Sequence, residues 1–201
     1  MRNTTKIKEA LDLIRQMGVV RPRDLVSHGI PPEYLRRLHA RGLVSQFARG
    51  VYRVTDAEVT AYSSLATIAK RVPDCVICLL SALRFHELTT QSPADVWIGI
   101  RSGDRVPALP GLFVRVVRYS RDSLTEGCDA HTIEGVTINV TNPGKTVADC
   151  FKYRNKIGID VAIEALRECK RLRLATTGQI ADYAKINRVL NVMRPYLEAL
   201  A

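Results

Sequence analysis

The stretch PPEYLRRLHARG at residues 31–42 decides how the N-terminal part of the chain folds. Prolines are tolerated in the first turn of a helix and a glycine favours its end, so a helix is predicted between them. Its apolar residues, Tyr34, Leu35 and Leu38, share one side, which indicates burial. The opposite stripe repeats at i, i+3, i+4, i+7 and is expected to face solvent: Glu33, Arg36, Arg37 and Ala40.

The flanking segments extend this pattern in both directions. Apolar residues at helical spacing between Ile7 and Ile14 predict a first helix that ends at Gly18. The segment VVRPRDLVSHG at 19–29 predicts a short second helix with Leu25 and Val26 pointing inward. LVSQFARGVYRV at 43–54 predicts a hairpin. This order is typical of a winged helix-turn-helix, assigned here to residues 1–56, whose third helix enters the DNA major groove while the hairpin follows the backbone.

The remaining residues, 57–201, are predicted to form a mixed α+β domain. The polar stretch 55–58 marks the boundary, and a helix is expected to join the two parts directly. Strand patterns follow in VWIGI at 96–100, LFVRVVRY at 112–119 and TIEGVTINV at 132–140. From Asn142 the pattern is helical to the end, with Asn142 and Thr176 as predicted caps. The fold class is therefore α+β with a helical C-terminal third.

The charge of the chain favours a polyanionic partner. Lysine and arginine number 30 against 20 acidic residues, for a net charge of +10. Residues 1–56 carry 11 basic and five acidic residues, so the smaller segment holds the larger excess. The sequence contains no apolar run long enough to span a membrane and no secretory signal. We therefore expect a cytoplasmic protein that binds double-stranded DNA.

The candidate DNA-binding residues lie on the predicted third helix, the hairpin and the start of the second helix. Arg36 and Arg37 can pair bidentately with guanine, and Glu33 could accept from cytosine or simply favour the helix N-terminus. The other candidates are expected to contact phosphates or the groove edge: His39, Arg41, Gln46, Arg49, Arg53, Arg21 and Arg23. Arg53 could instead cover apolar surface with its stem.

No pattern in the chain indicates catalysis, a metal or a cofactor. The pair Cys75 and Cys78 has zinc-like spacing but lies in the apolar run CVICLL, which favours buried thiols. NPGKT at 142–146 lacks the first glycine of a phosphate loop, because residue 139 is Asn. Ser81 lies outside any nucleophile-elbow motif. A nuclease would need clustered acids around a metal, and this pattern is missing from the sequence.

Four stretches together resemble the AbiEi-type antitoxins of bacterial abortive-infection toxin–antitoxin systems: FARGVYRV at 47–54, LLSALRFHELTT at 79–90, VTNPGKTVADCFKY at 140–153 and DVAIEAL at 160–166. The resemblance implies a non-enzymatic regulator whose winged helix represses its own operon. It also implies a second domain that antagonises a nucleotidyltransferase-like toxin. The operator at its own promoter is expected to be an inverted repeat, because paired reading heads meet paired half-sites.

The surface that opposes the toxin, or its substrate, carries no motif of its own. Basic residues around the helix after Pro143 are the candidates for this role: Lys145, Lys152, Arg154 and Lys156. A solvated helix face is the alternative interpretation of the same residues. For the protein as a whole, a ligand-sensing winged-helix transcription factor without a toxin partner remains the main alternative, with a DNA nuclease disfavoured.

Overall fold

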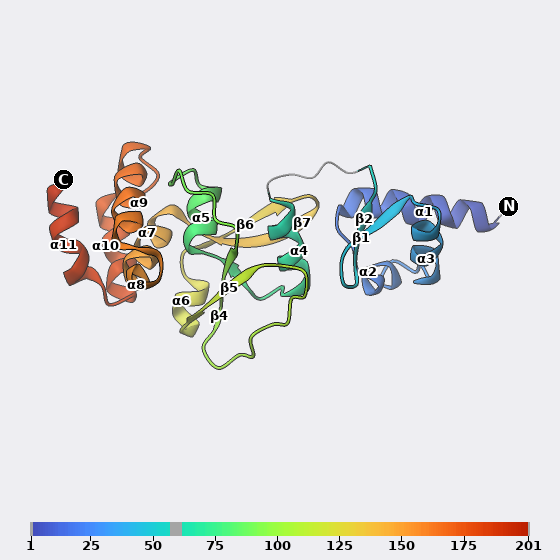
Figure 1. Ribbon diagram of the computed structural model, residues 1–201, viewed down its shortest axis with the longest axis horizontal. Helices are drawn as coiled ribbons and strands as arrows, with labels where there is room; N and C mark the ends of the chain where they lie inside the picture. The colour runs from blue at the N-terminus through green and yellow to red at the C-terminus, as the bar shows by residue number, and fades with distance from the viewer. Residues whose placement is uncertain (1, 57–61, 201) are drawn as a thin grey trace. The chain divides into compact units, whose positions relative to one another are not determined.

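The computed structural model describes residues 2–56 and 62–200, and their side chains except those of residues 2–5 and 47. The chain forms two compact units. Unit 1 comprises Met1–Pro73, Ala108–Leu112 and His131–Ile138, and unit 2 comprises Asp74–Pro107, Phe113–Ala130 and Asn139–Ala201. Figure 1 shows the elements of each unit along the chain. The predicted boundary between residues 56 and 57 adjoins residues outside the described ranges, and it stays a prediction about independent folding.

Three helices open unit 1: α1 (Arg2–Met17), α2 (Pro22–Val26) and α3 (Glu33–Ala40). Gly18, at φ 68°, ends α1 as predicted, in a left-handed conformation that glycine adopts without a steric penalty. Leu25 is fully buried on α2. Val26 is 55% exposed, so its predicted inward orientation was wrong. Consecutive side chains of an α-helix point about 100° apart, so Leu25 faces the core while Val26 turns toward solvent.

A two-stranded antiparallel hairpin follows the helices. Strand β1 (Val44–Ala48) pairs with β2 (Val51–Val54), with a register irregularity between Gln46 and Ala48. Backbone bonds in both directions between Val20 and Tyr52, at 2.9 and 2.8 Å, attach the segment before α2 to the hairpin. The predicted hairpin is confirmed. Its buried ends pack with the helices in one apolar cluster: Ala10, Ile14, Val20, Leu25, Ile30, Tyr34, Leu35, Leu38, Val44 and Val54.

Unit 1 continues past the hairpin with helix α4 (Ser63–Arg71). Lys70 of α4 forms an ion pair with Asp24 of α2, with 3.0 Å between Nζ and Oδ2. Ser63, at the start of α4, donates a hydrogen bond to Glu134. These contacts join segments that are distant in sequence within one unit.

Five strands form one mixed sheet in the order β5-β4-β3-β7-β6. Their bounds are Val76–Ile77 for β3, Val96–Arg101 for β4, Val114–Tyr119 for β5, Cys128–Ile133 for β6 and Val136–Thr141 for β7. The strands β4 and β5 run parallel, as do β3 and β7, whereas β3 and β4 are antiparallel. Helices α5 (Leu79–Phe85) and α6 (Arg121–Thr125) complete this part.

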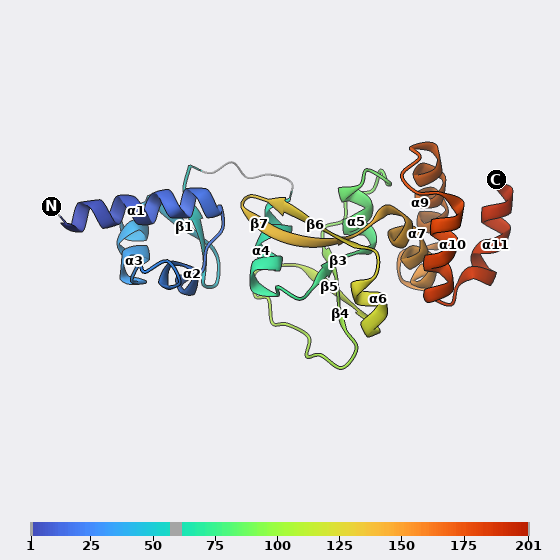
Figure 2. The ribbon, with the colours of Figure 1, turned by 180° about the vertical axis from the view of Figure 1, so that it is seen from behind.

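The C-terminal third is helical, which confirms the predicted α+β class. It contains α7 (Pro143–Lys152), α8 (Arg154–Ile157), α9 (Ile159–Arg171), α10 (Thr177–Ile186) and α11 (Leu190–Ala199). The two predicted caps are present. Asn142 accepts from the Lys145 N–H at 2.9 Å, and Thr176 forms a reciprocal capping box with Gln179. Helix α7 contacts both α9 and α10, and Figure 2 shows this group from behind.

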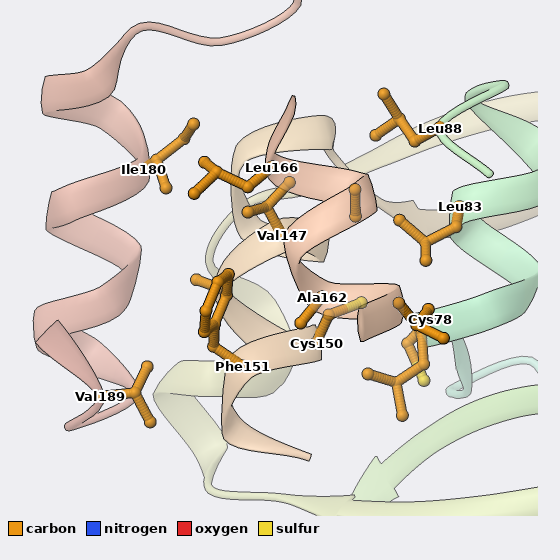
Figure 3. Packing of buried hydrophobic residues seen from close by; sticks show 14 of the residues in the cluster. Cys78, Leu83, Leu88, Val147, Cys150, Phe151, Ala162, Leu166, Ile180 and Val189 are labelled. Atoms are coloured by element: carbon orange, nitrogen blue, oxygen red, sulfur yellow. The ribbon is translucent and has the colours of Figure 1, made fainter. Parts of the chain in front are cut away.

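The core of unit 2 lies where these helices meet α5. Figure 3 shows Leu83, Val147, Phe151, Leu166 and Ile180 converging there. Cys78 and Cys150 are fully buried in the same cluster, and Cys75 is buried as well. The prediction that the closely spaced pair consists of buried thiols is confirmed.

The buried thiols of Cys78 and Cys150 are expected to make the stability of the folded protein sensitive to alkaline pH. Burial raises the pKa of Cys78 and Cys150 well above 9.0, and the nearby Asp149 charge adds to this shift. The folded state therefore retains protons that the unfolded state releases, so stability is full below pH 9.0 and is lost as pH rises beyond it. Measured by urea unfolding between pH 8 and 11, the free energy of unfolding should fall by up to about 1.4 kcal/mol per pH unit for each thiol.

The doubly substituted variant Cys78→Ala/Cys150→Ala provides the control for this expectation. Its stability should fall less steeply over the same pH range, although its stability at pH 8 is lower because methyl groups replace packed thiols. An identical slope in the two proteins would contradict the assignment of the effect to these cysteines.

Candidate nucleic-acid interface

Helix α3 presents a polar stripe opposite its buried face. Tyr34, Leu35 and Leu38 are buried, as predicted from their spacing. The other face is exposed throughout: Glu33, Arg36, Arg37 and Ala40. Because the apolar face is anchored in the cluster of unit 1, the arginines are held on a rigid element rather than on a loop. This arrangement suits a helix that inserts into a groove.

The two arginines of this stripe differ in their surroundings. Arg37 lies 3.3 Å from a carboxylate oxygen of Glu33, one turn earlier, and its guanidinium stacks 5.2 Å from the Tyr34 ring centre. Arg36 makes no ion pair or side-chain hydrogen bond within the described ranges. Arg36 is thus the side chain with all five donors available, whereas Arg37 is positioned by Glu33.

His39 connects α3 to the hairpin. Its Nδ1 lies 2.9 Å from the Val44 carbonyl oxygen. Its ring packs edge-to-face with the ring of Tyr52, with 5.9 Å between the two ring centres. These contacts fix the angle between the helix and β1. Arg41, the C-terminal cap of α3, is exposed beside it.

The hairpin places its polar side chains in three different settings. Gln46 is exposed and pairs in register with Tyr52. Arg49 is exposed at the bend between the strands. Arg53 is half-buried and lies opposite Ser45, in keeping with the alternative in which its stem covers apolar surface.

Near α2, the two predicted arginines have different partners. Arg21 is half-buried, and its Nη2 lies 3.7 Å from Asp24 Oδ1, while Arg23 is exposed. A shallow concavity of about 400 Å³ brings both together with Arg49 and Arg71 of α4. Arg71 is not among the candidates predicted from the sequence, because it lies beyond the predicted boundary of the DNA-binding domain. The basic pair at 70–71 was the only signal for it.

The basic residues proposed for toxin antagonism do not form one surface. Lys145 is 1% exposed and pairs with Asp149 at 3.2 Å, so its expected place on a surface patch was wrong. Lys152 is half-buried and donates to Asn187 at 3.3 Å, and burial lowers the pKa of Lys152. Arg154 is half-buried as well and donates to a backbone carbonyl. Lys156 alone of the four is exposed.

Lys145 belongs instead to a buried polar network around Asp149. The carboxylate accepts from the Tyr119 hydroxyl at 2.8 Å and from the Asn187 amide at 2.6 Å, in addition to Lys145. Ser123 donates to Asn187 at 3.0 Å. Burial raises the pKa of Tyr119, and the Asp149 charge raises it further, so the phenol remains a donor. The network is internally satisfied, which indicates a structural role.

The described residues give no geometric support for a metal site or a nucleophile. No group of three or more His, Cys, Asp or Glu side chains gathers among them in a metal-binding arrangement. The Ser81 hydroxyl accepts from the buried Trp97 N–H at 2.9 Å, and Asp95 pairs with Arg115. In the same ranges, no helix has the length and apolar character required to cross a bilayer.

Comparison with known proteins finds a family model and a solved structure that match this chain. The crystal structure of the RV2827C protein from Mycobacterium tuberculosis matches with a TM-score of 0.53 and 14% identity, covering 96% of this chain and 81% of that one. At this identity the match shows a similar fold. No curated protein sequence matches. Residues 8–55 match the model of the transcriptional regulator family of AbiEi antitoxins. The predicted resemblance is thus confirmed for the segment that carries α3 and the hairpin, which matches the AbiEi antitoxin family of transcriptional regulators.

Proposed function

We propose that the protein is a DNA-binding repressor of its own operon and an antitoxin against a nucleotidyltransferase-like toxin. The observation that carries the first part is the exposed arginine pair on α3, beside a basic hairpin, within a segment that matches transcriptional regulators. The order of α1, α2, α3 and the hairpin supports a winged helix-turn-helix assignment. The antitoxin part rests on the family match and on the resemblance of the later stretches.

In this proposal α3 reads the major groove and the hairpin follows the sugar–phosphate backbone. Arg36 supplies a planar pair of donors to guanine O6 and N7. The Glu33–Arg37 pair is exposed at the same face, so Arg37 can exchange its carboxylate partner for a base or a phosphate. His39 maintains the angle of α3 against β1, which sets the register of both elements on the duplex. An inverted-repeat operator would be read by two copies.

The decisive substitution is Arg36→Ala. It removes donors that have no partner in the described structure, so it should leave folding intact and cost roughly 1–3 kcal/mol of binding free energy on the promoter. On random duplex DNA the loss should be smaller, because base contacts contribute little there. Fluorescence anisotropy with a promoter duplex and a random duplex of equal length measures both values.

Arg37→Ala requires a matched control, because it leaves the Glu33 carboxylate facing DNA without its partner. The pair Glu33→Gln and Glu33→Gln/Arg37→Ala separates the contact from this repulsion in a double-mutant cycle. Equal losses on promoter and random DNA would assign both arginines to backbone contacts. Unchanged promoter binding in the Arg36→Ala variant would remove α3 as the recognition helix.

A further inference from the structure

A pocket lined by arginines lies on unit 1, to one side of α2. Its walls come from three separate segments of the sequence: residues 21–23 at the start of α2, residues 49–51 at the hairpin bend, and Arg71 at the end of α4. The pocket is a shallow concavity of about 400 Å³, open to solvent. None of its lining residues is acidic. We call this concavity the arginine pocket.

One carboxylate, that of Asp24, lies behind the arginine pocket and is already shared. It accepts from the Arg21 backbone N–H at 2.8 Å, and Lys70 Nζ lies 3.0 Å from it. Burial alone would raise the pKa of Asp24, but these donors hold that pKa below its usual value. Asp24 is therefore charged, and it positions Arg21 and Lys70 rather than neutralising the whole pocket.

The other cations of the pocket keep their charge available. Arg23, Arg49 and Arg71 pair with no carboxylate in residues 2–56 and 62–200. Arg71 donates to the Ala108 carbonyl at 3.3 Å, which holds its side chain. One buried guanidinium nitrogen of Arg71 and one of Arg21 have no acceptor among the described residues. Both guanidinium groups therefore keep hydrogen-bonding capacity that the described protein atoms do not use.

The form of the pocket favours a phosphodiester on a long polymer over a small enclosed anion. It is open on one side, and its far wall is the same hairpin that is proposed to follow the DNA backbone. At Gly50, which adopts φ 70°, an added Cβ would meet no atom within 4 Å, so the bend offers an unobstructed backbone surface. The convex sugar–phosphate backbone of a duplex can therefore approach the hairpin bend closely.

We propose that the arginine pocket binds a backbone phosphate of duplex DNA, and that Arg71 of α4 supplies part of its charge. The inference rests on the proposed DNA-binding function and extends it: the DNA-contacting surface includes α4, beyond the hairpin. Lys70 and Asp24 connect α4 to α2, so that Arg71 faces the same phosphate as Arg23 and Arg49.

The test compares salt dependence in the full-length protein. Arg71→Ala should weaken binding to a random 30-base-pair duplex about five- to tenfold at 0.1 M salt. The negative slope of log K against log salt should also become shallower, by about one. Arg71→Lys should recover most of the slope, because it keeps the charge. Arg167→Ala removes an exposed arginine of α9 in unit 2 and should leave the slope unchanged. Circular dichroism and thermal melting verify that each variant is folded.

Arg23→Ala provides a second variant, since Arg23 is exposed and its loss should not disturb the packing of α4. It should reduce the slope by a similar amount. If the wild-type slope is already near zero, the proposed DNA-binding function itself is wrong. If the wild type shows a steep slope that neither Arg23→Ala nor Arg71→Ala reduces, only the arginine pocket is overturned. Calorimetry with inorganic phosphate distinguishes a DNA phosphate from free phosphate as the ligand. If inorganic phosphate binds with micromolar affinity, and Arg71→Ala abolishes this binding while the DNA affinity stays unchanged, the arginine pocket is a site for free phosphate.

Discussion

Replacement of Asp149 by alanine is expected to lower the free energy of unfolding of unit 2 by about 3–5 kcal/mol. The carboxylate is fully buried on α7 and accepts hydrogen bonds from Tyr119, Asn187 and Lys145. Its removal leaves the Lys145 ammonium buried without a counter-charge, and two further donors without an acceptor. Each of these losses is costly in a medium that excludes water.

Two comparisons make this prediction specific. Asp182→Ala removes an acid of an exposed pair with Lys185 on α10, and should change stability by less than about 0.5 kcal/mol. The double variant Lys145→Met/Asp149→Leu replaces both charges with apolar groups and should be more stable than Asp149→Ala alone. Urea unfolding followed by circular dichroism measures all three. A loss below about 1 kcal/mol for Asp149→Ala would show that the network contributes little.

The N-terminal elements could be predicted because their signals are local. The paired prolines and the spacing of Tyr34, Leu35 and Leu38 define α3 within a dozen residues, and the structure buries those side chains as expected. Glycine and the basic bend define the hairpin in the same way. The bridge between Val20 and Tyr52 has no such signal, since one residue on each side carries it. Contacts of this kind depend on tertiary packing alone.

The basic residues of unit 2 show where charge in the sequence misleads. Lys145 has a polar side chain at the start of a helix, which usually indicates exposure. Its burial depends on Asp149 one turn later and on Tyr119 and Asn187, which are distant in sequence. The i, i+4 spacing of the lysine and the acid was the one local sign of an ion pair. The partners that make it internal could be found only from the fold.

Arg71 illustrates the same limit at the candidate site. In the sequence it is one of two basic residues at the end of a helix, where cations commonly compensate the helix dipole. Its place beside Arg23 and Arg49 arises because Lys70 reaches Asp24 of α2. The charge excess of residues 1–56 therefore predicts DNA binding at this end of the chain, but it gives no sign that a basic residue of α4 lies beside Arg23 and Arg49.

A fragment of residues 57–201 is expected to protect cells from the neighbouring toxin while failing to bind the promoter. Its apolar cluster runs from Val76 to Leu197, and the separate cluster of the N-terminal helices runs from Ala10 to Val54. Each part thus has a core of its own, which is what independent folding requires. Promoter binding should fall to background, because α3 and the hairpin are absent from this fragment. Growth rescue on co-expression with the adjacent gene product, and anisotropy on promoter DNA, measure the two activities.

Two N-terminal fragments and one surface variant complete this test. Residues 1–56 should bind DNA weakly and residues 1–73 more tightly, because the longer fragment retains Lys70 and Arg71, and neither should protect. Lys156→Glu in the full chain reverses an exposed charge, so it should reduce protection if that surface opposes the toxin, whereas Lys185→Glu on α10 serves as the matched control. Full protection by folded Lys156→Glu protein would remove that surface. Failure of residues 57–201 to rescue growth, together with a melting temperature that shifts with a small metabolite, would replace the antitoxin role with ligand sensing.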